Sequence, residues 1–575
     1  MRQFIFLTVL LLFIPLVYPM DGMMPLLAVK QTDNGYEGST AELFLEINEG
    51  TGRVFVDTFP LSKIDTQISM RFAKEIACDF LEYDCDDYDF IYTIRAGSPI
   101  IGGPSAGAAA TILTITVLSD IELKEDVSIT GTINSGGLIG PVGGLKEKIE
   151  AGAKNGLKKI LIPEGDRIKI NRSDNESINI TEFGKENDIE IIEVSNLISA
   201  LEVFTEQDFD SSDEEISISQ NYKNTMRGLA ASLCKRNSDL KEMVITKDIS
   251  QDVIEIYGSA MNLSIKGEIA SNQEEFYAAA SFCFGSNVKF NQVFLEMKNF
   301  SDSKYEGLLV ELRKEIESFE KKMDNKKIKT ITDLESYMVV KERLREGMMY
   351  ANLTKNLSYS YIYAYANERL RSAYSWAEFF KNQGKILELD EDSLRESCRQ
   401  RIAEAEERLQ YAAIYLPFEI ESARSDLDAA YDDFNNGDFE LCLFKASKSK
   451  AESNIVLNTL GIERDYVSKL IDNKLNAATK VIVKAEKKGM FPILGYSYYE
   501  YANNLRDDDE FSALLYAEYA LELSNLDIYF KERKMTKIWK VENSMIYILV
   551  MGVLIGFIMG FIVKKKPNKK AKKKR

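Results

Sequence analysis

The chain has 575 residues, enough for roughly two to four domains, and 45% of them are apolar and 28% charged, which is typical of a folded protein. It contains no histidine, which excludes Ser-His-Asp triads, Cys-His dyads and histidine-containing zinc sites. A formal net charge of −18 argues against nucleic-acid binding through phosphate neutralisation. A nucleophilic enzyme of this composition needs lysine or a carboxylate as its base.

The cysteines form no CxxC pair, so a zinc ribbon or a thioredoxin-type site is not expected. An even number fits disulfides in an exported protein, with Cys78–Cys85 as one local pair, although six unpaired buried thiols fit equally well. The six are Cys78, Cys85, Cys234, Cys283, Cys398 and Cys442.

The first 20 residues have the pattern of a signal peptide. Arg2 precedes an apolar run from Phe4 to Tyr18, which is short for a membrane span. No A-x-A cleavage site is evident, so residues 1–20 are predicted to be a signal peptide or an uncleaved signal anchor.

A second membrane signal lies near the other end of the chain. Residues 544–563 carry no charge, and a helix of this length extends roughly 30 Å, the thickness of a hydrocarbon core. The basic segment 564–575 follows and is expected to stay in the cytoplasm. We therefore expect a cell-membrane protein, anchored at one or both ends, with its bulk outside the cytoplasm.

Strands and helices alternate in residues 25–205 in the manner of an α+β domain. Residues 36–60 predict a β-hairpin that turns at 49–52. Helices are expected at 66–84, 105–118 and 145–155, the last ended by Gly156. Further strands are expected at 90–95, 127–133, 158–163 and 189–194.

From about residue 220 to 540 the pattern is helical, with breaks near 323–332, 383–391 and 487–496. Two stretches, beginning at 428 and 498, each predict a helix, a polar turn and a second helix. They are similar to degenerate tetratricopeptide hairpins, which would occupy about 424–526. A plain helical bundle is the alternative interpretation.

A candidate nucleophile stands in the segment Gly-Gly-Pro-Ser-Ala-Gly at 102–107. Ser105 opens an apolar helix, where free N–H groups can stabilise an oxyanion. A serine that only caps a buried helix would give the same pattern.

A candidate base follows at 136–149, where two glycine-rich turns lead into a helix with Lys146 and Lys148. A neutral lysine can take a proton from a hydroxyl group and later return it to a leaving amine. Either lysine taken alone is more simply a solvated surface charge.

Together these segments resemble the proteolytic domain of the Lon family. The resemblance rests on GGPSAGAAATILTITVLSD and DVSITGTINSGGLIGPVGGLKEKIEAGAKNGLKKILIPEGD, which keep the family's order and spacing. It is strong over residues 90–165 and extends over 25–205. It implies a Lon-type α+β domain with serine peptidase activity, followed here by the helical region and the membrane helix.

The resemblance also implies a role for each matching residue. Ser105 corresponds to the nucleophile and Lys148 to the general base. Thr130 corresponds to a threonine whose hydroxyl lies near that lysine. Backbone N–H groups around Gly103 to Ala106 would form the oxyanion hole.

Two supporting positions depart from the pattern: many members have Asp where Gly102 stands and Glu where Thr132 stands. No GxxxxGK[ST] motif occurs, so the chain has no recognisable P-loop. We expect cleavage of unfolded or flexible proteins without ATP, with no metal or organic cofactor. The resemblance also implies a homo-oligomeric ring.

Two other functions fit the same residues. One is a catalytically weak or inactive scaffold whose helical region binds partners. The other is a protease that processes only itself, for instance in the polar stretch 173–188.

Overall fold

The computed structural model describes residues 20–32, 35–101, 103–171, 176–209, 216, 220–245, 251–353, 357–380, 384–416, 420–459, 466–530 and 551–556. Contacts divide the chain into two compact units, Met1–Lys531 and Glu532–Arg575. In the second unit, residues 551–556 are helical.

No helix within the described ranges is both long and apolar enough to cross a membrane. The predicted span 544–563 lies outside these ranges except for residues 551–556. The predicted signal segment, up to residue 19, and the basic tail 564–575 also lie outside them.

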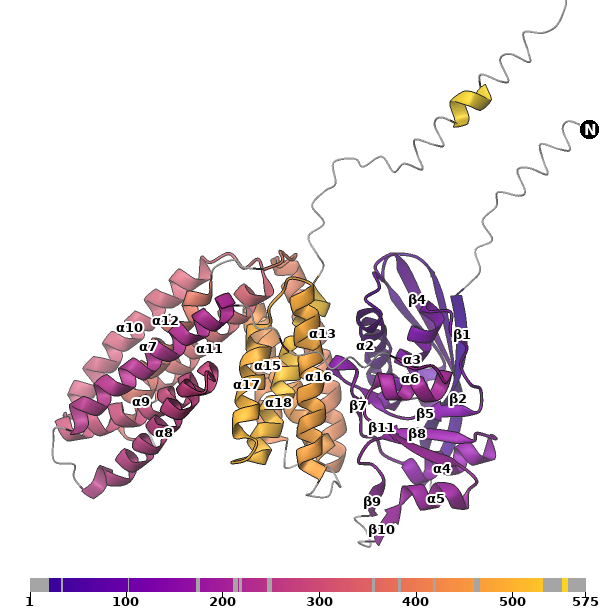
Figure 1. Cartoon of the computed structure of the whole chain (residues 1–575), viewed down its shortest axis with the longest axis horizontal. Coiled ribbons are helices and arrows are strands. Elements are labelled where there is room, and N and C mark those ends of the chain that lie inside the picture. The colour runs from indigo at the N-terminus through magenta and orange to yellow at the C-terminus, as the bar shows by residue number, and fades with distance from the viewer. Residues whose placement is uncertain are drawn as a thin grey trace, which may run out of the picture. The chain divides into compact units, whose positions relative to one another are not determined.

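The larger unit begins with an α+β domain (Figure 1). Its elements are β1 (Met20–Thr32), β2 (Gly35–Glu49), β3 (Val54–Ser62), α2 (Ile64–Phe80), β4 (Tyr88–Ile101), η1 (Pro104–Ala106), α3 (Gly107–Leu118), β5 (Val127–Ile129), β6 (Thr132–Ile133), η2 (Ser135–Gly137), β7 (Ile139–Gly140), α4 (Leu145–Lys154), β8 (Lys159–Pro163), β9 (Ile168–Asn171), β10 (Glu176–Asn179), α5 (Ile180–Glu186), β11 (Glu190–Val194) and α6 (Leu197–Thr205).

Two main sheets organise this domain. One has the strand order β1-β2-β4-β3, in which only the β3–β4 pair is parallel. The other is parallel, with the order β11-β8-β5. Helix α3 is buried continuously from Gly107 to Thr116, because it has small and apolar residues on every face.

The predicted hairpin at 36–60 is wrong in its pairing. The chain does turn after Glu49, but β4 lies between β2 and β3. The Asp89 carboxylate accepts hydrogen bonds from the backbone N–H groups of Thr51, at 2.8 Å, and Arg53, at 3.0 Å. These bonds hold the turn against the start of β4. As a result β2 pairs with β4, and not with β3, which follows it directly in the sequence.

The other predicted elements of this domain are found with shifted ends. The strand predicted at 127–133 is divided into β5 and β6 at Thr130 and Gly131. Strands β1, β7, β9 and β10 and helices α5 and α6 are absent from the sequence prediction.

The helical region follows, as expected. Its elements are α7 (Gln220–Ile245), η3 (Gln251–Val253), α8 (Ile254–Asn272), α9 (Phe276–Lys298), α10 (Asp302–Asp324), α11 (Ile331–Ala351), α12 (Tyr359–Trp376), η4 (Ala377–Phe379), α13 (Glu391–Tyr415), α14 (Glu421–Asn436), α15 (Phe439–Asn458), α16 (Val467–Lys487), α17 (Ile493–Leu505), α18 (Glu510–Ser524) and η6 (Leu526–Tyr529).

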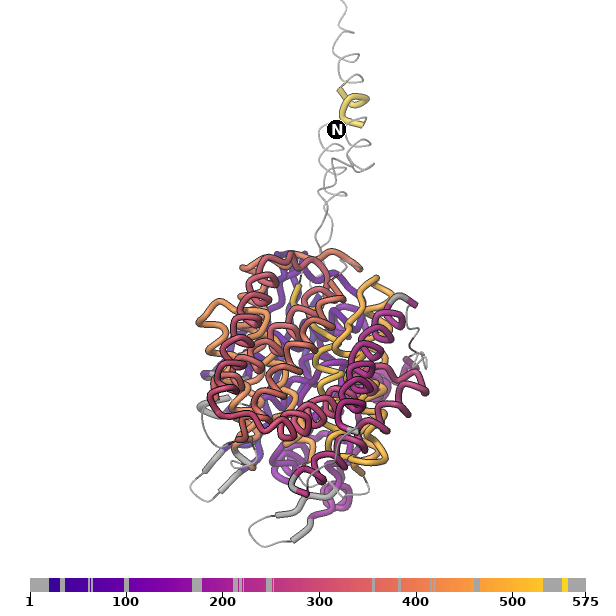
Figure 2. Tube along the Cα trace, turned by 90° about the vertical axis from the view of Figure 1, so that its left-hand side faces the viewer, coloured from indigo at the N-terminus to yellow at the C-terminus, as the bar shows by residue number. Residues whose placement is uncertain are grey.

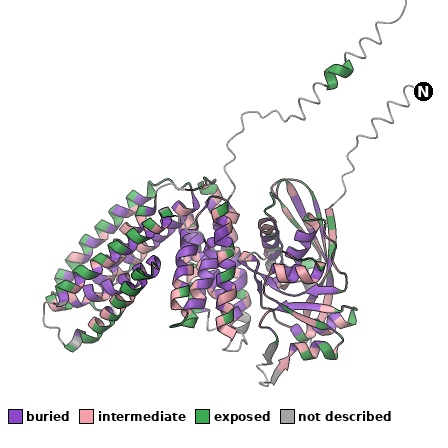
Figure 3. Ribbon diagram, viewed as in Figure 1, coloured by how far each residue is buried: buried purple, intermediate pink, exposed green. Residues whose placement is uncertain are grey.

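The three predicted breaks are confirmed as the ends of α10, η4 and α16. Helices α14 and α15 form one contacting pair and α17 and α18 another, at the two stretches predicted to form hairpins. Figure 2 shows the helices from a second side, and Figure 3 shows buried positions along most of them. The tetratricopeptide assignment of 424–526 stays a prediction.

All six cysteines are paired in disulfides. Cys78–Cys85 joins the end of α2 to the loop before β4, as the sequence suggested. Cys234–Cys283 joins α7 to α9, and Cys398–Cys442 joins α13 to α15. The alternative of unpaired thiols is therefore wrong.

Candidate active site

Ser105 lies at the junction between β4 and the buried helix α3. Gly103 precedes it with a φ of 101°, a backbone conformation that favours glycine, and starts the short helix η1. Ser105 is half-buried. Its carbonyl oxygen accepts a hydrogen bond of 3.0 Å from the N–H of Gly131, which fastens the serine to the end of β5.

Lys148 lies one turn into α4 and is 3% exposed. The residue before the helix, Gly144, has a left-handed backbone with a φ of 68°. The helix packs closely on β2, since a Cβ atom added to Gly38 would lie 1.8 Å from the carbonyl oxygen of Glu147. Glycine at these positions brings α4 close enough to bury a lysine that would otherwise be solvated.

Thr130 connects the two candidates. The Lys148 Nζ donates a hydrogen bond of 2.9 Å to the Thr130 Oγ1, and Thr130 is 1% exposed. Gly131, the next residue, is the one bonded to Ser105. The structure therefore brings Ser105, Thr130 and Lys148 together around the break between β5 and β6.

Lys146 takes a different position from Lys148. Its Nζ lies 5.6 Å from the centre of the Phe183 ring on α5. Of the two lysines, Lys148 is the one that contacts Thr130, the threonine that the resemblance places near the base.

Gly103 and Ala106 flank Ser105 at the start of α3. Ala106 is half-buried and precedes the first residue of that helix. The N–H of Gly107 is already bonded to the carbonyl of Pro104. Backbone N–H groups around Gly103 to Ala106 stay the oxyanion donors that the resemblance implies.

One of the two departures from the family pattern can be located. Gly102 lies outside the described residues. Thr132 is buried in β6 opposite Gly140, where an added Cβ atom would lie 2.4 Å from the Thr132 Oγ1. Thr132 therefore packs directly against the backbone of β7.

The chemistry of this site uses a hydroxyl group and an amine. Among the described residues, no group of three or more Cys, Asp or Glu side chains is arranged to hold a metal ion. A buried amine beside hydroxyl groups is suited to moving protons in acyl transfer.

Comparison with known proteins identifies this domain. Residues 71–202 match the model of the Lon protease (S16) C-terminal proteolytic domain. The chain carries a Lon-family proteolytic domain. It is 45% identical over 74 residues to the Lon protease of Trichlorobacter lovleyi, covering 13% of this chain and 9% of that protein. It is 35% identical over 128 residues to the Lon protease of Rickettsia bellii, covering 22% of this chain and 16% of that protein.

The chain thus spans only a small part of the length of the curated Lon proteases it matches. The family model ends at residue 202, before the helical region begins. For the helices from α7 onward, a role can therefore be inferred only from the contacts that they make in this structure.

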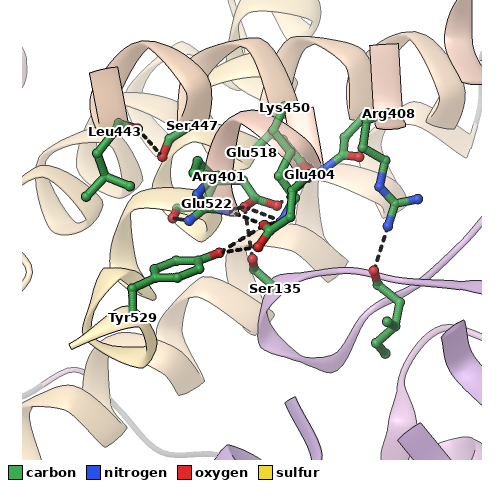
Figure 4. Close-up of polar contacts among 12 residues, drawn as sticks. Ser135, Arg401, Glu404, Arg408, Leu443, Ser447, Lys450, Glu518, Glu522 and Tyr529 are labelled. Carbon is green, nitrogen blue, oxygen red and sulfur yellow. Dashed lines mark hydrogen bonds and ion pairs between the residues drawn. The ribbon is translucent and has the colours of Figure 1, made fainter. Parts of the chain in front are cut away.

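Several residues that contact the Lon-type domain were missed by sequence reasoning. Tyr411 on α13 bonds to the backbone of Gly143. Arg408 on α13 bonds to the backbone of Ile133, and Glu522 on α18 bonds to Ser135 (Figure 4). No local pattern in the sequence could have indicated these pairs, because 268 or more residues separate the partners.

Proposed function

We propose that this chain is a membrane-anchored serine endopeptidase that cleaves unfolded or flexible proteins without ATP. Ser105 is the nucleophile and Lys148 is the general base and acid. The observation that carries the proposal is the buried Lys148 amine, bonded to Thr130 beside the backbone that holds Ser105.

The proposed reaction has two acyl-transfer steps. Lys148, as the neutral amine, takes the proton of the Ser105 hydroxyl while the oxygen attacks the substrate carbonyl carbon. Backbone N–H groups of residues 103–106 bind the negative oxygen that forms. Lys148 then gives the proton to the leaving amine as the C–N bond breaks, and a water molecule hydrolyses the acyl-serine in the same way.

Thr130 has a supporting role in this scheme. Once Lys148 carries the proton it is a buried cation, and a buried charge without a hydrogen-bond acceptor is strongly destabilised. The Thr130 Oγ1, 2.9 Å from Nζ, is such an acceptor.

The test is labelling with a serine-reactive probe followed by peptide mapping. We expect the full chain to be labelled at Ser105, with labelling lost in Ser105→Ala and strongly reduced in Lys148→Ala. Thr116→Val is a suitable control, because that hydroxyl bonds only within its own helix. Absence of label on Ser105 in the folded wild type would favour the scaffold function instead.

The membrane anchor and the extracytoplasmic location belong to the proposal. They are supported by the uncharged segment 544–563, by the basic tail after it and by the three disulfides, which are typical of oxidising compartments.

The location is tested by adding protease to intact cells that carry a tag after residue 575. We expect the bulk of the chain to be degraded while the tag survives, and alkylation of the denatured, unreduced protein to find no thiol. Protection of the whole chain, or six alkylated cysteines, would contradict the proposed location.

A further inference from the structure

The β6–β7 hairpin, residues 132–140, connects the two catalytic segments of the Lon-type domain. It is preceded by Thr130 and Gly131 and is followed by the turn that leads into α4 and Lys148. Its strands pair Thr132 with Gly140, and its tip is the short helix η2. The hairpin is thus joined directly to Thr130 on one side and, through a short turn, to the helix of Lys148 on the other.

The tip of the hairpin is packed into the helical region. Gly136 has a φ of 69°, and a Cβ atom there would lie 2.8 Å from Leu521 of α18 and 3.2 Å from Val481 of α16. Leu138 is 8% exposed and belongs to the hydrophobic core of the helical region. The tip of the hairpin is therefore in direct contact with α16 and α18.

Helix α13 holds both ends of the hairpin. Arg408, which is 4% exposed, donates a hydrogen bond of 2.7 Å to the carbonyl of Ile133 at the end of β6. One helical turn later, the Tyr411 hydroxyl accepts a bond of 2.9 Å from the N–H of Gly143, which lies two residues before the start of α4. One rigid helix thus fixes the backbone on both sides of the hairpin.

A buried ionic network holds the tip against α13, α15 and α18. The Ser135 hydroxyl donates to Glu522 at 2.9 Å. Glu522 pairs with Arg401 of α13, at 2.8 Å, and Lys450 of α15, at 3.1 Å, and all three are buried. Figure 4 shows these side chains converging on one point beside Ser135. Moving one partner of such a network away leaves a buried charge without its counter-charge, which strongly destabilises the folded state. The network therefore holds its members in fixed positions.

We propose that α13 is a positioning element of the active site, with Tyr411 and Arg408 as positioning residues that act through the backbone of Gly143 and Ile133. This inference rests on the proposed peptidase function. It makes the helical region part of the catalytic unit, although the family model does not include it.

The main test is Tyr411→Phe in the full chain, which removes the acceptor of the Gly143 N–H and keeps the ring. The control is Tyr431→Phe, which removes a tyrosine hydroxyl that bonds to Glu406 on the exposed side of α13. We expect kcat on an unfolded substrate to fall about fivefold to tenfold in Tyr411→Phe, with KM within about twofold of wild type. The control should keep the wild-type kcat and KM.

Arg408→Met and Arg408→Lys give a second comparison. Methionine removes the donor to Ile133, and lysine keeps a cationic donor. We expect at least a tenfold loss of kcat for methionine and partial recovery for lysine. If Arg408→Met does not fold, Tyr411→Phe still decides the question.

Amide hydrogen exchange of residues 139–149 separates positioning from general stability and does not need activity. Faster exchange in this segment together with lower kcat in Tyr411→Phe supports the inference. Wild-type kcat in Tyr411→Phe, whatever its exchange or Tm, overturns it. If the wild type cleaves nothing, the proposed function fails. In that case, faster exchange of residues 139–149 in Tyr411→Phe would still support the role of α13 in positioning this segment. Unchanged exchange would overturn that role as well.

Discussion

For Lys148, the sequence predicted the identity of the candidate base but not its burial. The family resemblance alone selected Lys148 over Lys146, and in the structure Lys148 bonds to Thr130 while Lys146 lies beside Phe183. The burial of Lys148 could not be predicted, because α4 itself has the composition of a surface helix. Burial comes from its close approach to β2 at Gly38, which is distant in sequence.

Replacing Thr130 by valine tests the contact of Lys148 at the residue scale. Valine has almost the same shape but offers no acceptor, so protonated Lys148 loses about 1.5–3 kcal/mol of stabilisation. We expect kcat to fall roughly tenfold to hundredfold, and Thr130→Ser to restore most of it. Thr116→Val serves as the control, since it removes another buried hydroxyl of the domain. Equal rates for Thr130→Val and Thr116→Val would contradict the role of Thr130.

At the scale of elements, the sequence predicted helices better than strand pairing. Most expected helices are present, because their apolar positions follow a local period. The β2–β3 hairpin was wrong because alternation shows that a segment is a strand but not which strand lies beside it. Strand β7 was missed because it has only two residues, too few for any period to show, and β6 was merged with β5 in the strand predicted at 127–133.

The start of α4 offers a prediction at this scale. An alanine at Gly144 would have a φ of 68° and a Cβ atom 2.5 Å from the Cγ2 of Val29. We expect Gly144→Ala to lower the free energy of unfolding by roughly 2–4 kcal/mol, from backbone strain and the clash together. The same change should abolish most cleavage, because α4 carries Lys148.

Gly156 after α4 is the matched control, because its φ is 79° and an added Cβ atom would meet no other atom within 4 Å. Gly156→Ala should cost only the backbone strain, about 1 kcal/mol, and keep the wild-type rate. Urea unfolding and a cleavage assay measure both quantities. Equal effects at the two glycines would show that α4 tolerates displacement.

At the scale of the whole molecule, the helical region was predicted as a separate part, and its contacts with the Lon-type domain were not predicted. Arg408, Tyr411 and Glu522 look like ordinary residues of amphipathic helices. Their role depends on which helix faces the hairpin, and that follows from tertiary packing alone.

The buried network also predicts how stability depends on pH. Burial by itself would raise the pKa of Glu522, but Lys450 and Arg401 outweigh it and lower the pKa from 4.5 to about 2. The folded state therefore binds this proton less tightly than the unfolded state. The resulting stabilisation, on the order of 3 kcal/mol, is complete above about pH 4.5 and is lost as the pH falls toward 2.

Glu522→Gln should remove this part of the pH dependence. It should also lower the Tm at pH 7, because Arg401 and Lys450 lose a buried counter-charge. Glu391→Gln is the control, since Glu391 pairs with Arg395 on the surface. Thermal unfolding between pH 2 and 7 measures the effect. Parallel Tm curves for wild type and Glu522→Gln would rule out this role for Glu522.

The most direct measurement of the central claim is the incubation of the purified full chain with casein in the absence of ATP. Ser105→Ala and Lys148→Ala are incubated beside it. We expect fragments from the wild type, none from either variant, and no acceleration when ATP is added. Cleavage by Ser105→Ala at the wild-type rate, or no cleavage by the folded wild type, would contradict it.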